Sequence, residues 1–469
     1  VRSHLFGAAN TALPHLRGDT AMIDRIKSFL ATACRVDITQ VVLPGGRAFL
    51  PAQAVQPAVK PGEVVEAHVV VRNLGVGHAF PAGTVDSNEV WLAFEANVEG
   101  QPAFYASGRL DPVTGQLDPA SEQYRAYWER RDGKRFVSRV AHDLYTLIYA
   151  RRIGPGTADV VRYRFRVPEG ATGRLELKAT LRYRKFSMDH LLNVAQVLGS
   201  KDGFTIEHQL EQDYLVPGET VSVDLRRLPV VDMATTKPFA LPITPEGTPG
   251  PPPDPTTLKL QLPDDRDRVN DLAIANLIQG DPDRARELFR LVTRIDPKYP
   301  DGWVNVARAA MAKQDVDDAS ESVAQALALK PGYPKALFFR AIARRNSPGG
   351  DFVGAEADLR EVLKTFPRDR ESHRRLADVL FQQDKFHEVL DVCDAFMAID
   401  AQDWEIWYWA MRAYQALGDE PRAAAAKAAH DKYRPDDDFT NRRGPTLLED
   451  ENIHRLAQPI HEHVQPGLR

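Results

Sequence analysis

A repeat of 34 residues in the second half of the chain constrains the fold more than any other feature of this 469-residue sequence. One recurring position follows the expected end of a helix and is proline in four of five cases: Pro297, Pro331, Pro367, Ala401 and Pro435. A second position, mostly alanine, keeps the same register: Ala285, Ala319, Ala355, Val389 and Ala423. A small side chain lets two helices approach closely, and a proline ends a helix. The pattern predicts stacked helix pairs.

The segment from Asp283 to Pro297 resembles the tetratricopeptide repeat. The resemblance covers residues 266 to about 435, about five units, and we place the repeat domain at 263–435. It implies an all-α solenoid whose groove binds a protein partner. The interval from Pro331 to Pro367 is 36 residues, which places two extra residues in the loop 346–351, and Ala401 in place of proline is expected to soften its turn.

Before the repeats, from Val36 to about Leu228, apolar residues recur at every second position. This alternation, clearest at 161–167 and 175–183, is typical of half-buried antiparallel strands. Further elements are expected as a short helix at 188–198 and as strands at 36–42, 64–72, 89–98, 103–109, 144–150 and 220–225. With the Pro- and Gly-rich turns between them, they predict an all-β immunoglobulin-like sandwich over 36–228.

Three segments flank these domains. Residues 1–35 are interpreted as an extended segment plus an amphipathic helix over 20–34, with Thr20 as N-cap and Cys34 on the apolar side. Residues 229–262 are predicted to be a linker, because eight of the 21 positions from 237 to 257 are proline. Residues 436–469 are expected to be a polar tail, in which the pair His461 and His463 could bind a metal but is usually solvated.

Composition excludes several classes of protein. A net charge of -5 argues against a nucleic-acid binder, and no apolar run reaches the roughly 18 residues of a transmembrane helix. The two cysteines, Cys34 and Cys393, exclude a disulfide framework, a zinc site built on Cys pairs and a Cys-x-x-Cys-His haem attachment site in this chain. No nucleophile motif, phosphate loop or His-Glu-x-x-His helix is present, so an enzyme is disfavoured.

The loop Gly-His-x-x-Pro-x-Gly at 77–83 carries the most functional information. Gly75 and Gly77 let the backbone come close to another group, so that His78 is presented by the loop. Two interpretations stay open: His78 bonds a backbone carbonyl as part of the loop, or it is a metal ligand.

Together with the stretch His4 to Asn10 and the strand from Leu181 to Phe186, this loop resembles the region after the haem-binding part of multihaem c-type cytochromes. That resemblance covers residues 3 to about 228 and implies electron transfer at a periplasmic or extracellular location. It implies His4 and His78 as distal ligands to haem iron and His15 as a further cofactor-binding candidate, with Asp86 or Glu89 holding the second ring nitrogen of His78.

The cofactor would be haem c, although this chain lacks an attachment motif. The haem would therefore belong to a missing N-terminal part, since the chain opens without Met, or to a partner cytochrome subunit or haem domain. The first hypothesis is thus a non-catalytic part of a multihaem cytochrome, with a docking repeat domain. The alternative is a tetratricopeptide-repeat scaffold without haem contact, and a third is a hydrolytic sandwich enzyme using Asp86 and Glu89.

The repeats carry one dense aromatic group: Trp404, Trp407, Tyr408 and Trp409. These side chains are too close in sequence to share one buried helix face. We therefore expect some of them to reach a groove or a protein partner.

Overall fold

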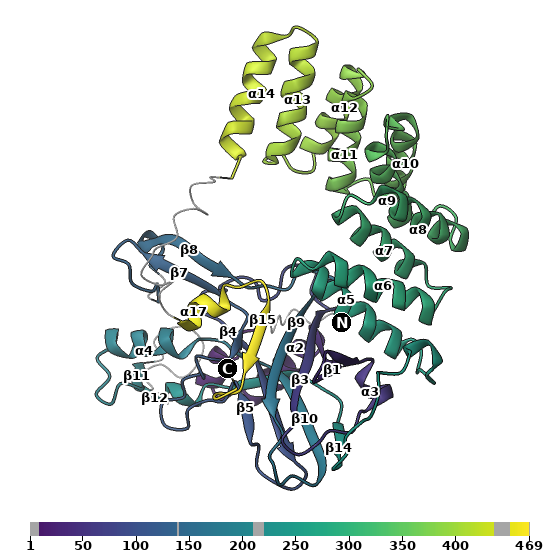
Figure 1. The fold of residues 1–469 in the computed structure, drawn as a ribbon. Helices are drawn as coiled ribbons and strands as arrows, with labels where there is room; N and C mark the ends of the chain where they lie inside the picture. Colours follow the sequence, from purple (N-terminus) through teal and green to yellow (C-terminus); the bar gives the residue numbers. More distant parts are fainter. Residues whose placement is uncertain (1–8, 138–139, 210–219, 436–450, 469) are drawn as a thin grey trace. The chain divides into compact units, whose positions relative to one another are not determined.

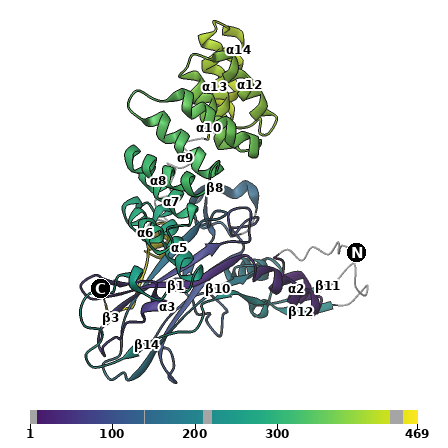
Figure 2. The same ribbon diagram turned by 90° about the vertical axis from the view of Figure 1, so that its right-hand side faces the viewer.

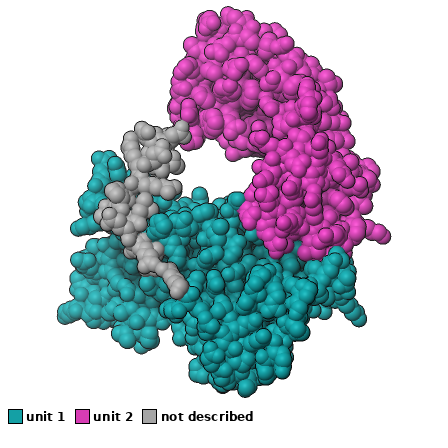
Figure 3. Space-filling model, in the orientation of Figure 1, with its two compact units in different colours: residues 1–280, 438–469 teal, residues 281–437 magenta. Residues whose placement is uncertain are grey.

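The structure, a computed structural model, describes residues 9–137, 140–209, 220–435 and 451–468. The chain divides into two compact units, one of residues 1–280 with 438–469 and one of residues 281–437 (Figure 3). The first unit is rich in strands, and the described part of the second is helical. The prediction of a strand-rich N-terminal region followed by helical repeats is confirmed.

The first unit is built on two sheets, with two smaller strand pairs beside them (Figure 1). One sheet has the strand order β15-β9-β3-β1-β2, and the other has the order β13-β10-β4-β5, with β14 also on β10 and β6 on β4; the smaller pairs are β7 with β8 and β11 with β12. The strands are β1 (Cys34–Leu43), β2 (Arg47–Phe49), β3 (Val64–Asn73), β4 (Glu89–Val98), β5 (Tyr105–Ser107), β6 (Glu122–Gln123), β7 (Ala126–Arg130), β8 (Leu144–Ala150), β9 (Ala158–Arg166), β10 (Gly173–Arg184), β11 (Thr205–Gln209), β12 (Thr220–Asp224), β13 (Val230–Thr235), β14 (Phe239–Ile243) and β15 (His461–Val464).

The two sheets share one apolar core. Phe94 of β4 stacks on Tyr163 of β9 with ring centroids 4.2 Å apart, and the Tyr163 hydroxyl donates to the Leu92 carbonyl at 3.4 Å. An immunoglobulin-like sandwich is not confirmed, because the sheets are small and the first is mixed: β15 runs parallel to β9, whereas the other pairs of that sheet are antiparallel.

The region predicted to be a linker contributes two strands. Both β13 and β14 pair with β10, so the strand-rich unit extends beyond Leu228. Alternate apolar side chains such as Val231, Met233 and Leu241 are buried, and this burial outweighs the nearby prolines. Proline is tolerated at sheet edges and strand ends, as at Pro242 near the end of β14.

The N-terminal helix is shorter than predicted. The helix α2 runs over Thr20–Leu30, and its N-cap is Asp19, not Thr20. The Asp19 carboxylate accepts a hydrogen bond from the Met22 amide at 2.9 Å, as a capping side chain does. Cys34 is buried as expected, but as the first residue of β1.

The second unit is a succession of antiparallel helices, which Figure 2 shows from the side. They are α6 (Pro282–Ile295), α7 (Pro300–Ala312), α8 (Val316–Leu329), α9 (Pro334–Asn346), α10 (Phe352–Thr365), α11 (Arg370–Phe381), α12 (Phe386–Met397), α13 (Trp404–Ala416) and α14 (Glu420–Tyr433). All five repeated small positions are buried. The loop between α9 and α10, in which two extra residues were predicted, has five residues, whereas the loop between α7 and α8 has three.

The first predicted repeat helix, α5 (Asp264–Ile278), belongs to the strand-rich unit. It packs on β1, β3 and β9, and its Asp271 carboxylate pairs with Arg35 and Arg72 of the first sheet. These buried polar contacts explain why α5 is part of that unit although its sequence follows the repeat pattern.

Part of the expected polar tail is folded. Residues 451–464 form α17 (Glu451–Leu456) and β15, and β15 pairs with β9 along 161–164. His461 and His463 are buried, because alternate side chains of this strand point into the unit. No helix in the described part of the chain is long and apolar enough to cross a membrane.

Candidate functional site

The loop that carries His78 follows β3 and is held by backbone contacts. A Cβ atom on Gly75 would lie 2.0 Å from the Thr32 carbonyl oxygen, so this position requires glycine. The Asn73 side chain donates hydrogen bonds to the carbonyl oxygens of His78 and Ile153, at 3.1 and 3.0 Å. These contacts fix the path of the backbone up to His78.

The His78 ring is exposed, and its Nδ1 lies 3.0 Å from the carbonyl oxygen of Ala79. A carbonyl oxygen only accepts, so this contact places a proton on Nδ1, and in the neutral ring Nε2 then has a lone pair. The group that holds the ring is therefore a backbone carbonyl, not the predicted carboxylate of Glu89. Glu89 is buried and accepts hydrogen bonds from Nε of Arg184 at 2.8 Å and from Nη2.

Of the other two predicted histidines, the structure describes only His15. His4 lies outside the described residues. His15 lies on α1 (Ala12–Leu16) and is half-buried. Within the described chain no hydrogen bond or ion pair links His15 to His78.

In the repeats, a tryptophan supports the turn that lacks proline. The Trp407 indole donates to the Ala401 carbonyl at 2.9 Å, and the Trp303 indole donates to the Pro297 carbonyl at 3.1 Å. The same bond therefore spans both turns, and at Ala401 it replaces some of the restraint that a proline ring supplies. The helix before Ala401, α12, nevertheless has 12 residues where α10 has 14.

A stripe of half-buried side chains, which we call the aromatic stripe, runs along α13: Trp404, Tyr408 and Arg412. These positions are four residues apart and so share one helix face, next to the buried face at Ile406 and Ala410. Arg412 donates to the Tyr408 hydroxyl at 2.8 Å and lies 4.8 Å from the ring centroid of Phe381.

None of the four aromatic side chains at 404–409 is fully buried. The expectation that they do not share one buried face is confirmed. Trp407 and Trp409 pack against the apolar core of the repeats, and the part of each ring that stays in water is available to a partner.

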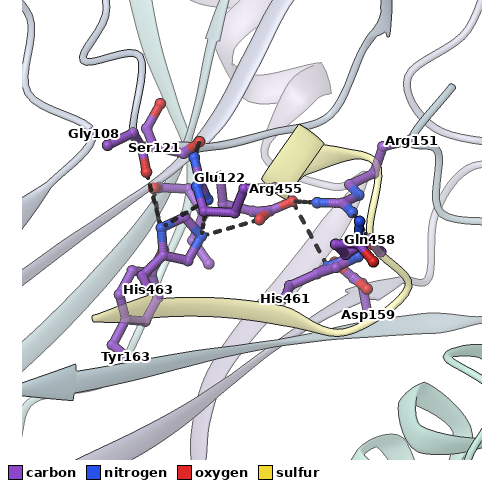
Figure 4. A network of polar contacts seen from close by, with 12 residues as sticks. Gly108, Ser121, Glu122, Arg151, Asp159, Tyr163, Arg455, Gln458, His461 and His463 are labelled. Atoms are coloured by element: carbon purple, nitrogen blue, oxygen red, sulfur yellow. Dashed lines mark hydrogen bonds and ion pairs between the residues drawn. The ribbon is translucent and has the colours of Figure 1, made fainter. Parts of the chain in front are cut away.

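A second candidate site was anticipated only in part from the sequence, which named His461 and His463 as a possible metal-binding pair but expected them to be solvated. It is a cluster of buried side chains from three strands of the first unit: Glu122 of β6, Asp159 of β9, and His461 and His463 of β15 (Figure 4). Ligand atoms of Glu122, Asp159 and His461 all lie within 4.8 Å of one another. Nδ1 of His461 is 3.0 Å from Asp159 Oδ2 and 3.7 Å from Glu122 Oε1.

His463 occupies the other side of Glu122, with Nε2 3.1 Å from Glu122 Oε2. Its Nδ1 lies 2.9 Å from the Ala120 carbonyl oxygen, and its ring stacks on Tyr163 with centroids 5.0 Å apart. Figure 4 shows the Glu122 carboxylate between the two histidines. The ring of His463 is thus fixed by a backbone carbonyl and an aromatic face.

Charges in this cluster act in opposite directions. Burial raises the pKa of Glu122, but Arg151, which donates to its carboxylate, and the two histidines hold that pKa well below its usual value. Burial lowers the pKa of His463, Glu122 opposes this effect, and Arg455 adds to it. Since Arg151 is permanently charged, we infer that Glu122 is ionised between the two histidines.

The cluster had a weak signal in the sequence. The alternation His-Glu-His-Val at 461–464 has the period of a strand, but four residues are too few to predict one. No signal joins these positions to Glu122 and Asp159, which lie more than 300 residues earlier in the chain.

Comparison with protein families identifies tetratricopeptide repeats in the helical region. Family models of the tetratricopeptide repeat match residues 276–343 and 349–403. A crystal structure of MamA is 15% identical and aligns over 35% of this chain and 94% of its own, with a TM-score of 0.32. MamA from Desulfovibrio magneticus RS-1 is 14% identical over 37% of this chain and 97% of its own, with a TM-score of 0.34. TTC0263, a tetratricopeptide-repeat protein of Thermus thermophilus, is 19% identical over 39% of this chain and 99% of its own, with a TM-score of 0.32.

Proposed function

We propose that this protein is an assembly scaffold whose tetratricopeptide repeats bind a protein partner. The observation that carries the proposal is the aromatic stripe on α13, where Trp404 and Tyr408 pack against His430 of α14 and keep their rings half-exposed. Stacked helix pairs provide an extended surface, and aromatic and Arg side chains are the residues that most often dominate binding energy at such surfaces.

The test compares partner binding of the full chain with that of the Tyr408→Ala variant. A partner found by quantitative affinity mass spectrometry is purified, and its dissociation constant is measured by calorimetry for both proteins. We expect binding to weaken about tenfold or more, since loss of a central interface tyrosine commonly costs about 1–3 kcal/mol. Val353→Ala is the matched control, because Val353 is exposed on α10 at 71%. Equal loss in both variants, or no loss in Tyr408→Ala, contradicts the assignment of the stripe.

A second candidate function is electron transfer next to a haem c group, and the geometry of His78 favours it. The ring is exposed, one nitrogen is held by a backbone carbonyl, and the other has a lone pair, which is the arrangement that a histidine ligand to iron needs. In this proposal the haem belongs to a partner cytochrome subunit or to a longer form of the chain, at a periplasmic or extracellular location. His4 and His15 remain candidate cofactor-binding residues, with His4 as a second distal iron ligand.

Visible spectra of the chain together with its haem-bearing partner test this candidate. We expect His78→Ala to shift the Soret band and the reduction potential, while His454→Ala, which removes an exposed histidine on α17, leaves both unchanged. Identical spectra for the parent protein and His78→Ala would leave the scaffold function as the remaining proposal.

A further inference from the structure

One position of the repeat is tryptophan in two repeats and histidine in another. It recurs at intervals of 34, 36 and 34 residues, as Trp303, Leu337, His373 and Trp407. The Trp303 and Trp407 indoles pack on the apolar clusters of the repeats, and each donates to the carbonyl of the residue six positions earlier. An imidazole is smaller than an indole, so the chain itself fills less of the space beside His373.

A groove lies beside His373, between α10, α11 and α12 (Figure 1). We call it the histidine groove. Its volume is about 490 Å³, which lies in the range of about 300–1,000 Å³ that is common for ligand pockets. Its apolar lining includes Leu363, Leu376 and Val392, of which the last two are buried. The space is large enough for an aromatic side chain that enters from outside.

The His373 ring offers one hydrogen-bond acceptor to this groove. The residue is 6% exposed and lines the groove. Its Nδ1 lies 2.9 Å from the Asp369 carbonyl oxygen, which only accepts, so Nδ1 carries the proton. In the neutral ring Nε2 is then an acceptor, and it is not among the polar atoms that the protein encloses, so it opens on the groove. A group that displaces water from Nε2 must itself supply a donor.

Most charges at the rim of the groove are already compensated. Arg360 of α10 pairs with Glu388 of α12 at 2.5 Å, and Lys364 pairs with Glu361 at 2.7 Å. Asp391 is the remaining charged residue of the lining, and it is exposed. Inside the groove a charged ligand group would lose water without gaining a counter-ion. The groove therefore suits a neutral, apolar group that carries one donor.

We infer that the histidine groove binds a tryptophan side chain of a protein partner, whose indole fills the groove and donates from its N–H to Nε2 of His373. Indole combines a large apolar ring with a single donor, which matches the apolar lining and the one acceptor. The repeats place their own indoles at this position in two other units. Recognition of tryptophan here rests on the proposed function, since it specifies how the partner of the scaffold is bound.

The test uses the full chain and N-acetyl-tryptophanamide as the probe, with binding measured by calorimetry. A second probe, the 1-methylindole analogue of the first, has nearly the same ring without the N–H donor. We expect one saturable site for the first probe and binding about tenfold or more weaker for the second, because the second leaves Nε2 without a donor. In His373→Phe the two probes should bind equally, because the acceptor is gone.

His373→Trp is the decisive variant, because it supplies the indole from the chain itself, with the Pro367 carbonyl six positions earlier as its acceptor. Binding of N-acetyl-tryptophanamide and of the purified partner should each weaken about tenfold or more. The matched control is His387→Ala, since His387 lies on α12, is exposed and does not line the groove.

Equal binding of the two probes by the parent protein overturns the inference, and this comparison needs no variant to fold. Unchanged binding of the probe or of the partner by His373→Trp overturns it as well. Either result leaves the proposed function standing, because that function is tested at Tyr408 on α13, outside the lining of the histidine groove.

Discussion

Replacing Glu89 by alanine should lower the unfolding free energy of the strand-rich unit by about 3–5 kcal/mol. The reason is the burial of its partner: the Arg184 side chain has no exposed surface, and Glu89 is 4% exposed. Without the carboxylate, the guanidinium keeps only the Gly115 carbonyl, at 2.9 Å, as a hydrogen-bond acceptor among the described residues. A buried charge that loses its counter-ion costs far more than an exposed pair of similar geometry.

Hydrogen exchange at amides of β4 and β10 measures this loss within the full chain. A cost of about 3–5 kcal/mol corresponds to a fall in protection of about 100-fold or more for amides that exchange through unfolding of the unit. The matched control is Asp232→Ala. Asp232 pairs at 2.9 Å with Arg182, which lies on β10 like Arg184, but the Asp232 side chain is 57% exposed. That variant should lose about 0–1 kcal/mol.

A double variant separates charge burial from packing. Glu89→Leu combined with Arg184→Met leaves no uncompensated charge and should recover most of the stability. The reasoning is refuted if Glu89→Ala costs no more than Asp232→Ala, or if the double variant is as unstable as the single one. A large loss of stability in Glu89→Ala would also show that the Glu89 carboxylate has a structural role, which does not require the catalytic role considered from the sequence.

Two further predictions concern the repeats. Trp407→Phe removes the indole hydrogen bond to the Ala401 carbonyl and should lower the stability of the repeats in urea unfolding by about 0.5–1.5 kcal/mol. Trp303→Phe should cost less, because Pro297 still restrains its own turn. Equal losses in the two variants would show that the proline does not stabilise this turn. Burial raises the pKa of the Asp301 carboxyl, but the hydrogen bonds that it accepts from Lys335 and Tyr333 lower the pKa by more than burial raises it. The pKa of Asp301 is therefore depressed in the folded state. The ionised Asp301 carboxylate therefore stabilises the folded repeats at pH values above its unfolded-state pKa of about 3.9, and this stabilisation is lost as pH falls through the folded-state pKa. Between pH 6 and pH 3, the urea midpoint should therefore fall less in Asp301→Asn than in the parent protein.

The repeats and several strands were predictable because they depend on local patterns. The small residues that are buried between repeat helices recur about every 34 residues. The alternation of apolar side chains over ten residues predicted both ends of β4, Glu89–Val98, correctly. The partial exposure of the aromatic side chains at 404–409 was predictable for the same reason, since helix periodicity alone shows that four such close neighbours cannot share one buried face.

Other elements depend on contacts that a single sequence does not contain. The helix α5 follows the repeat period, but its buried Asp271 pairs with Arg35 and Arg72, more than 190 residues earlier, and so it belongs to the strand-rich unit. The strands β13 and β14 lie within residues 229–262, which the Pro-rich composition predicted to be a linker. In each case, burial in three dimensions outweighed the local signal.

The buried cluster combines both difficulties and gives the chain order a physical consequence. Glu122 and Asp159 precede the repeats, whereas His461 and His463 follow them, so the helical unit is inserted in the sequence of the strand-rich unit. Until β15 is in place, the pairing edge that it covers on β9 is open and the two carboxylates lack their histidine partners. Since an open edge and poorly compensated buried charges both disfavour the unit, its stability depends on residues beyond the repeats. A chain that ends after α14 should therefore show faster amide exchange along β9, even though no residue of β9 has changed.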